Sequence, residues 1–304
     1  MTGARLALAG CFLSILPVCS AQAADVFEHA AGTDLFVSTD ADDTDVVKGG
    51  INLDWRFKGP ELYQGIRLER AWFKPLGGKS KDFDRAYLRY GDASGHWAWT
   101  TQAGTDGHTA LGSVTVHDDA RFRKEFFLER EILETPQGIR KGLYYTFGGA
   151  ALDLPINERN NVTLVAGLQE FTGKNERLHL RGIYTHVVKP DWGLSLQLRG
   201  RYFYSSHPGE YDYFSPRWYS EVLPVLQLRR FSAGWRYSVA AGFGAQRDSA
   251  SDWRASRYVN AQVTSPAVGH HWFVKAGLVY SNTPVGSGYV YDYTQFNIAL
   301  THAF

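Results

Sequence analysis

Two groups of residues in this sequence have side chains that could perform acid–base or nucleophilic chemistry. His117-Asp118-Asp119 ends a predicted strand, and there a histidine beside a carboxylate could exchange protons with a substrate. Ser205-Ser206-His207 could pair a hydroxyl with a base, but nothing fixes nearby Glu210 as the acid that orients the histidine. We interpret both groups as solvated turn residues, and we expect no catalytic residues and no enzyme activity.

Two other groups have the side chains of metal ligands. His270-His271 supplies two imidazoles without a third ligand. Four aspartates crowd residues 40–45 as in a calcium loop, but Thr44 interrupts the alternation of carboxylates that such a loop requires. The alternative for these aspartates is a looser contact of a divalent cation with lipopolysaccharide. We therefore expect no metal site and no cofactor.

The first residues have the pattern of an export signal. Arg5 precedes an apolar run from Leu6 to Val18, and Ala21-Gln22-Ala23 matches a signal-peptidase site. Residues 1–23 are thus predicted to be a cleaved signal peptide, which leaves residues 24–304 as the folded domain. Both cysteines, Cys11 and Cys19, would be removed, which excludes disulfides and thiolate chemistry. The formal net charge of +1 gives no global field that would attract nucleic acid.

The remaining sequence alternates between apolar and polar residues. Aromatic residues make up 14% of the chain and charged residues 21%, the mean hydropathy is −0.29, and no apolar stretch of 18 residues occurs. These values exclude a helical membrane protein. They fit a membrane barrel, because the lumen-facing residues lower the hydropathy of every strand.

We predict an all-β fold, a transmembrane antiparallel up-and-down β-barrel of sixteen strands, or of fourteen if one hairpin is divided wrongly. The expected strands are Val26–Thr39, Val46–Phe57, Glu61–Phe73, Phe83–Tyr90, His96–Ala103, Thr109–His117, Arg121–Glu131, Lys141–Ala151, Val162–Phe171, Leu178–His186, Trp192–Tyr204, Trp218–Arg229, Trp235–Arg247, Arg254–Val263, Trp272–Ser281 and Tyr289–Phe304.

The predicted connections differ in length between the two ends of the barrel. The even-numbered connections are mostly tight, and several odd-numbered ones are longer: Lys74–Asp82, Ser205–Arg217, Asp248–Trp253 and Asn282–Gly288. Short periplasmic turns and longer external loops are typical of outer-membrane barrels, so we expect both chain ends in the periplasm. The localisation that follows is the cell outer membrane of a Gram-negative bacterium.

The last predicted strand alternates through its final ten residues. Its apolar face carries Phe296, Ile298, Leu300, His302 and Phe304. A strand that ends on an aromatic residue resembles the signal that barrel-assembly machinery reads on its client proteins. The alternative is an ordinary edge strand, which is less favoured because exposed apolar edges are normally avoided.

Charged residues occupy the face of each strand opposite the apolar one. Because a charge at mid-bilayer on the lipid side costs about 2–4 kcal/mol, these residues are expected to point into the lumen. Arginine and tyrosine there could bind sugars, and the alternative is an ion-pair lattice that fills the pore. The candidate track residues are Arg67, Glu69, Arg85, Tyr87, Arg89, Arg123, Glu125, Glu129, Tyr144, Arg181, Arg199, Arg201, Arg229, Arg236 and Lys275.

One segment suggests a family. Tyr211-Asp212-Tyr213-Phe214-Ser215-Pro216-Arg217-Trp218-Tyr219 is followed by Leu223-Pro224-Val225, Trp235-Arg236-Tyr237 and Gly242-Phe243-Gly244-Ala245-Gln246. This order resembles the C-terminal outer-membrane β-barrel of exopolysaccharide exporters of the cellulose synthase operon type, and the poly-N-acetylglucosamine and Pel porins are similar in architecture. The resemblance implies a sixteen-stranded channel that exports a polysaccharide. The alternative for residues 213–216 is a proline-ended turn with aromatics at the lipid interface.

The resemblance also sets out the expected partners and the competing functions. The exporters carry a periplasmic helical-repeat scaffold before the barrel, and no such repeat occurs here, so either a separate scaffold subunit supplies it or the barrel does something else. Outer-membrane lipid, lipopolysaccharide and the barrel-assembly machinery are the other expected partners. The alternatives are a general small-solute porin, which would need a long inward-folded loop that the sequence does not suggest, and a receptor or scaffold barrel without transport.

Overall fold

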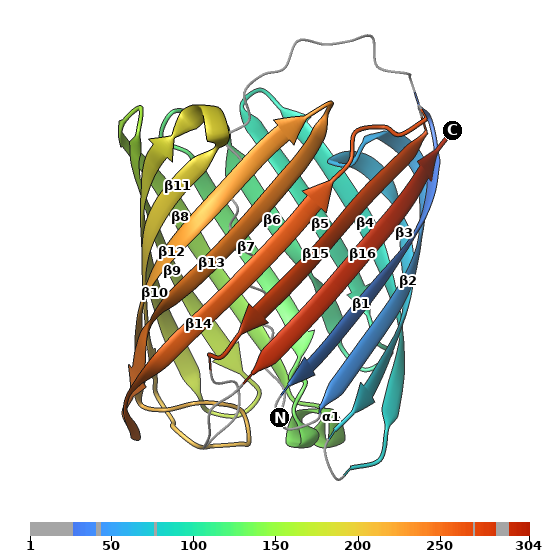
Figure 1. Cartoon of the computed structure of the whole chain (residues 1–304). Helices are drawn as coiled ribbons and strands as arrows, with labels where there is room; N and C mark the ends of the chain where they lie inside the picture. The colour runs from blue at the N-terminus through green and yellow to red at the C-terminus, as the bar shows by residue number, and fades with distance from the viewer. Residues whose placement is uncertain (1–26, 41–43, 76–77, 270, 284–291) are drawn as a thin grey trace.

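The structure is a closed antiparallel β-barrel whose strands follow one another around the wall in chain order (Figure 1). It is a computed structural model that describes residues 27–40, 44–75, 78–269, 271–283 and 292–304. The predicted signal peptide, Asp42, Asp43, His270 and the start of the last predicted strand lie outside these residues.

The described part contains sixteen strands, as predicted. They are β1 (Ala30–Asp40), β2 (Asp45–Gly59), β3 (Leu62–Lys74), β4 (Lys81–Ser94), β5 (Trp97–Thr105), β6 (Ala110–Asp118), β7 (Lys124–Ile132), β8 (Tyr144–Asn157), β9 (Asn160–Phe171), β10 (Glu176–Lys189), β11 (Leu194–Ser205), β12 (Trp218–Ser232), β13 (Trp235–Asp248), β14 (Ser251–Thr264), β15 (Trp272–Ser281) and β16 (Tyr293–Ala303). Between β7 and β8 lies the helix α1 (Pro136–Lys141), and between β10 and β11 the 3₁₀ turn η1 (Pro190–Trp192).

The barrel closes where β1 pairs with β16. Their register runs without a break from Ala30 opposite Ala303 to Asp40 opposite Tyr293. Phe304 extends the seam, because its carbonyl oxygen accepts hydrogen bonds from the backbone N–H groups of Glu28 and His29 at 3.2 and 3.0 Å. Closure pairs every strand on both sides, which removes the exposed edges that a flat sheet of this size would present.

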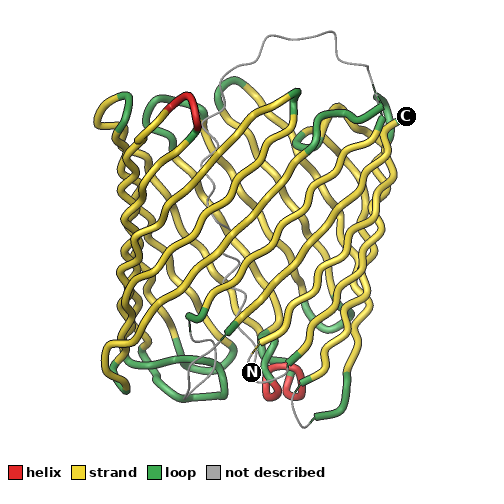
Figure 2. Tube along the Cα trace, viewed as in Figure 1, coloured by secondary structure: helices red, strands yellow, loops and turns green. Residues whose placement is uncertain are grey.

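The two ends of the barrel differ, as Figure 2 shows. At the end that holds the C-terminus most of the turns are tight, for example between β4 and β5 and between β12 and β13. The opposite end carries the longer connections of residues 133–143 and 206–217. The prediction of a long loop at Asp248–Trp253 was wrong. The carboxylate of Asp248 accepts hydrogen bonds from Ala250 N and Ser251 Oγ, so residues 249–250 form a tight turn.

The outer face of the wall is apolar. Leu88 is 64% exposed and Phe243 is 66% exposed, and neither points toward the lumen. The apolar outer surface therefore follows the predicted alternation of the strands. Exposed tryptophans lie near both ends of the wall, where the amphipathic indole ring suits a membrane interface. They are Trp55, Trp97, Trp192 and Trp272 at the C-terminal end, and Trp72 and Trp253 at the other.

The five predicted assembly residues alternate with Asn297, Ala299, Thr301 and Ala303 along β16 and its end. Phe296, Ile298 and Leu300 are each about 40% exposed on the outer face, and Phe304 is exposed beyond the strand. The ring of His302 packs on Trp272 at a centroid distance of 4.5 Å. A recognition role for these residues stays a prediction.

Candidate functional site

The interior of the barrel holds a cavity of about 770 Å³ that is lined by polar and charged residues. Eleven of the fifteen candidate track residues line it: Arg67, Glu69, Tyr87, Arg89, Glu125, Glu129, Arg181, Arg199, Arg201, Arg229 and Lys275. The alternation of each strand therefore brings charged side chains from β3, β4, β7, β10, β11, β12 and β15 to one space.

The other four candidates have different surroundings. Arg85 is 3% exposed and lies behind the cavity surface in an ion-pair network. Arg123 contacts Glu125 through Nη2 and Oε2 at 3.3 Å. Arg236 is opposite Phe231, near the C-terminal end of the barrel. Tyr144 begins β8 at the rim, where its hydroxyl donates to Asp106 at 2.7 Å.

Tyr144 is 7% exposed and packs inside the barrel, in the buried cluster that holds Tyr87 and Ile139. Its neighbour Tyr145, which the sequence interpretation did not include, is buried as well. Its hydroxyl donates to Glu129 Oε1 at 2.8 Å, and its side chain is 1% exposed. Both tyrosines are therefore buried at the start of β8, where the alternation of the strand does not yet hold.

Half of the lumen wall carries charges that neutralise one another. We name this set the ion-pair face: Asp34, Lys48, Arg67, Glu69, Arg85, Glu131 and Glu134. Arg67 Nη2 donates to Asp34 Oδ2 at 2.7 Å and to Glu69 Oε2 at 2.6 Å. Arg85 joins Glu69 to Glu131 with two contacts of 3.0 Å. Each of these cations thus lies against carboxylates.

The other half is rich in arginine. We name this set the arginine face: Arg181 on β10, Arg199 and Arg201 on β11, and Arg229 on β12. Arg181 lies directly opposite Arg201 in the β10–β11 register. Like charges in such a position repel each other, so a sheet does not place them there for stability.

Aromatic rings form a row beside the arginine face. The row runs from Phe127 through Phe147, His179 and Phe203 to Tyr219, with centroids 4.9–5.6 Å apart. Its first members line the cavity, whereas Phe203 and Tyr219 are covered.

Two glycines make room for the row. A Cβ at Gly149 would lie 2.6 Å from Phe127 Cζ, and a Cβ at Gly167 would lie 2.8 Å from Phe147 Cε2. The rings therefore lie flat over the backbone of β8 and β9, and a side chain at either position would displace them.

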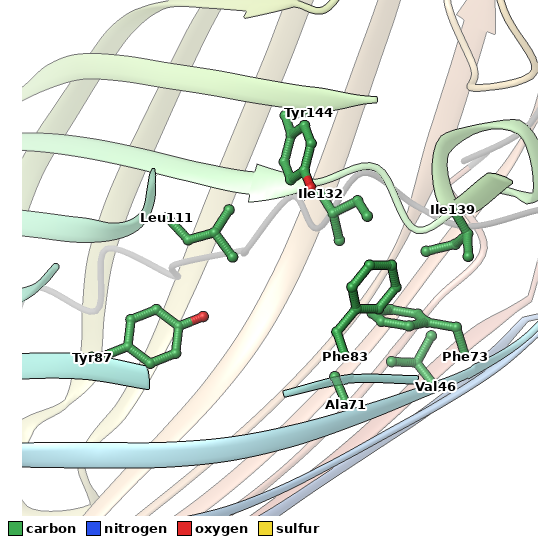
Figure 3. Packing of buried hydrophobic residues seen from close by; sticks show 9 residues of the cluster. All are labelled: Val46, Ala71, Phe73, Phe83, Tyr87, Leu111, Ile132, Ile139 and Tyr144. Carbon is green, nitrogen blue, oxygen red and sulfur yellow. The ribbon is translucent and has the colours of Figure 1, made fainter. Parts of the chain in front are cut away.

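The connection between β7 and β8 folds into the lumen. Ile139 of α1 packs against Val46, Phe73 and Phe83, which belong to the inner face of β2, β3 and β4 (Figure 3). Lys48 Nζ of β2 contacts Glu134 Oε1 of the connection at 2.7 Å. Residues 133–143 therefore reach from one side of the mouth toward the other.

The same connection contacts the long loop between β11 and β12. The backbone N–H of Gln137 donates to Asp212 Oδ2 at 2.7 Å, and Lys141 Nζ lies 5.1 Å from the centre of the Tyr211 ring. Together the two connections narrow this end of the lumen. The sequence offered a signal for α1, since Thr135 caps its start, Pro136 begins it and Gly142 ends it in a left-handed conformation.

The segment that suggested a family packs inward. The ring of Tyr213 stacks on Phe171 at 4.4 Å, and the ring of Phe214 meets Phe203 edge-on at 6.0 Å. Asn175 Nδ2 donates to the Tyr213 hydroxyl at 2.8 Å, and burial raises the pKa of Tyr213 to about 12. The alternative of interface aromatics at residues 213–216 was wrong, because Tyr213 is 1% exposed beneath the loop.

Arg177 is a lumen residue that the sequence interpretation missed. Its guanidinium lies 4.4 Å from the centre of the Phe203 ring and 5.0 Å from that of Phe171, and it donates to the carbonyl oxygen of Phe214. Arg177 shares the face of Arg181 in the alternation of β10, which could have identified it. It fixes the 206–217 loop over the arginine face.

The residues considered for other chemistry do not assemble into a site. His117 Nε2 lies 3.8 Å from Asp119 Oδ1 at an exposed turn. His207 contacts Ser206, but the carboxylate of Glu210 accepts from the backbone of Lys174 and Asn175 instead. Among the described residues no group of three metal-ligating side chains occurs. The helices in that part of the chain are too short or too polar to cross a membrane.

Comparison with known proteins gives a fold but no family. No family model and no curated protein matches the sequence. Among solved structures, a bacterial polysaccharide outer membrane secretin superimposes with a TM-score of 0.64 and 14% identity over 92% of this chain and 100% of that chain. OccAB3 of Acinetobacter baumannii superimposes with a TM-score of 0.45 and 10% identity over 91% of this chain and 99% of that chain. OmpT of Vibrio cholerae superimposes with a TM-score of 0.42 and 7% identity over 94% of this chain and 100% of that chain. The chain thus has the fold of an outer-membrane β-barrel.

Proposed function

We propose that this protein is an outer-membrane channel through which a polysaccharide leaves the cell. The observation that carries the proposal is the lining of the lumen, where the rings of Phe127 on β7 and Phe147 on β8 lie in the same cavity as the guanidinium and amide groups of β10 to β12. Planar donors bind the hydroxyl and carboxylate groups of sugars, and rings stack on their apolar faces. The likeness of the fold to a polysaccharide secretin supports the same function.

The proposal includes an orientation in the membrane. Tight turns face the periplasm at the end that holds the C-terminus, and the connections with α1 and residues 206–217 face the outside. In this orientation a chain that enters from the periplasm meets Arg229 first and the covered rings below the 206–217 loop last. The scaffold that delivers the chain would be a separate periplasmic subunit.

Single-channel recording tests the proposal. Purified barrel is inserted into planar bilayers, and linear oligosaccharides are added on one side. We expect transient blocks of the current, and fewer or shorter blocks for Phe127→Ala and Phe147→Ala. Phe243→Ala is the matched control, because the Phe243 ring lies on the outer face and is 66% exposed. If no oligosaccharide blocks the current, the proposal is wrong.

A general small-solute porin is the second candidate, and one observation favours it. The 133–143 connection folds into the lumen, which is a feature of diffusion pores that the sequence interpretation did not find. Liposome swelling separates the two functions. A porin admits monosaccharides and disaccharides at rates that fall steeply with size, whereas a polysaccharide channel is distinguished by binding long linear chains.

A further inference from the structure

The ion-pair face and the arginine face differ in whether their cations lie next to carboxylates. On the ion-pair face, Arg67 and Arg85 lie within 3.0 Å of carboxylate oxygens, so their charges are compensated inside the protein. On the arginine face, no described carboxylate lies within ion-pair distance of Arg199 or Arg201. A cation held away from acids in a partly enclosed space attracts an external anion more strongly than a paired cation does.

Arg199 is held by neutral groups. Its Nε and Nη2 donate to Gln197 Oε1 at 2.9 and 2.8 Å, and its guanidinium lies 4.8 Å from the centre of the Tyr258 ring. Gln197 is fixed in turn, because its Nε2 donates to Gln227 Oε1 at 2.7 Å. An amide and a ring orient a guanidinium without cancelling its charge.

Arg201 packs against aromatic rings and has no amide partner in the part of the chain that the structure describes. Its guanidinium lies 4.9 Å from the centre of the Tyr219 ring, and its buried Nε has no hydrogen-bond partner among the described residues. Glu221 is opposite Arg201 in the register, but its carboxylate accepts from Ser256 Oγ and Thr283 Oγ1 and lies beyond ion-pair distance. Glu221 therefore does not neutralise Arg201, and the charge of Arg201 remains available to an anionic ligand in the lumen.

The two guanidinium groups are arranged for a repeating ligand. Arg199 and Arg201 are two residues apart on one face of β11, which separates them by about 6.7 Å along the strand. Guanidinium groups pair with carboxylates through two parallel hydrogen bonds. A chain that carries a carboxylate on each sugar could bind one group and then the next.

We propose that the arginine face is the binding track for an acidic polysaccharide, with Arg199 and Arg201 as its central contacts and carboxylate-bearing sugars as the units bound. This inference rests on the proposed function and adds the chemical class of the substrate. The ring and amide supports keep the track in place between successive sugars, and the ion-pair face presents no excess of cations that would compete for the chain.

The test compares sugars of equal length and different charge. An oligomer of glucuronic acid and a neutral glucose oligomer are applied to wild-type single channels, and the reversal potential is measured in a potassium chloride gradient. We expect an anion-selective current that the acidic oligomer blocks. Arg199→Gln and Arg201→Gln should each weaken the block about tenfold, the equivalent of losing one charge-assisted hydrogen bond.

Controls separate charge from folding. Arg199→Lys keeps the charge and should retain the anion selectivity, and Arg70→Gln removes an arginine that is 51% exposed on the outer face. Heat-modifiable mobility on gels verifies that each variant forms a barrel. The acidic track is refuted if the neutral oligomer blocks the current as well as the acidic one does, or if Arg70→Gln weakens the block as much as Arg201→Gln does. In either case the proposed function as a polysaccharide channel is retained. If neither oligomer blocks, the proposed function fails and this inference fails with it.

Discussion

Lys48 should contribute more to stability than any surface lysine of this barrel. Its Nζ lies 2.7 Å from Glu134 Oε1 and 3.7 Å from Glu131 Oε2, and the side chains of Lys48 and Glu134 are only 1% and 2% exposed. Lys48→Met removes the cation and leaves two desolvated carboxylates beside a methyl group. Breaking one side of a buried pair typically costs about 3–5 kcal/mol.

Denaturant unfolding in detergent micelles measures this cost, with tryptophan fluorescence as the signal. Lys74→Met is the matched control, because Lys74 Nζ lies 3.6 Å from Asp45 Oδ2 with side chains 71% and 44% exposed. An exposed pair is worth about 0–1 kcal/mol. Lys48→Met combined with Glu134→Gln should recover most of the loss, because the buried acid is then neutral. Equal costs for Lys48→Met and Lys74→Met, or no recovery in the double variant, would refute the reasoning.

Three further predictions concern the wall and its turns. Leu88→Arg should lower the free energy of unfolding by about 2–4 kcal/mol in lipid vesicles, since residue 88 faces the bilayer, and Leu88→Phe should be nearly neutral. Gly149→Leu should cost about 1–3 kcal/mol and shift the near-ultraviolet circular dichroism, because its side chain would collide with the ring of Phe127; an unchanged spectrum would contradict the close approach. Burial acts to raise the pKa of Asp106, but hydrogen bonds from the Tyr144 hydroxyl and two backbone N–H groups hold this pKa below its ordinary value of 3.8. The turn that contains Asp106 is therefore stabilised above that value. As the pH falls below it, the protection of the amide hydrogens of this turn, taken relative to their intrinsic exchange rates at each pH, should decrease, and Asp106→Asn should lack this transition.

The barrel could be predicted from the sequence because its signal is local. Alternation with a period of two identifies each strand and its outer face, and Gly, Pro, Asn and Asp mark the turns. The sixteen strands follow from that pattern. Their ends do not, since pairing at the rim depends on the neighbour: β14 begins at Ser251, earlier than predicted, because Asp248 fixes a tight turn.

The site could be predicted only in part. Alternation places Arg199 and Arg201 in the lumen, but which arginines are compensated depends on registers between strands, as in the contacts of Arg85 with β3 and β7. The helix α1 is too short to have a period, and its inward fold depends on Lys48 and Phe83 from distant strands. The inward packing of Tyr213 on Phe171 and of Phe214 on Phe203 involves rings that lie outside the segment itself.

Hydrogen bonds through side-chain amides connect Arg199 to Gln197 and Gln197 to Gln227. These bonds within the wall and the binding of an anion to the wall should respond differently to ionic strength. Dissolved ions screen the attraction between a guanidinium and a passing anion across water. They barely affect a bond between a guanidinium and an amide oxygen, or its stacking on a ring. High ionic strength outside the cell would therefore weaken the binding of an anionic chain to the arginine face while the structure of the lumen wall stays unchanged. Release of the chain would then require no conformational change.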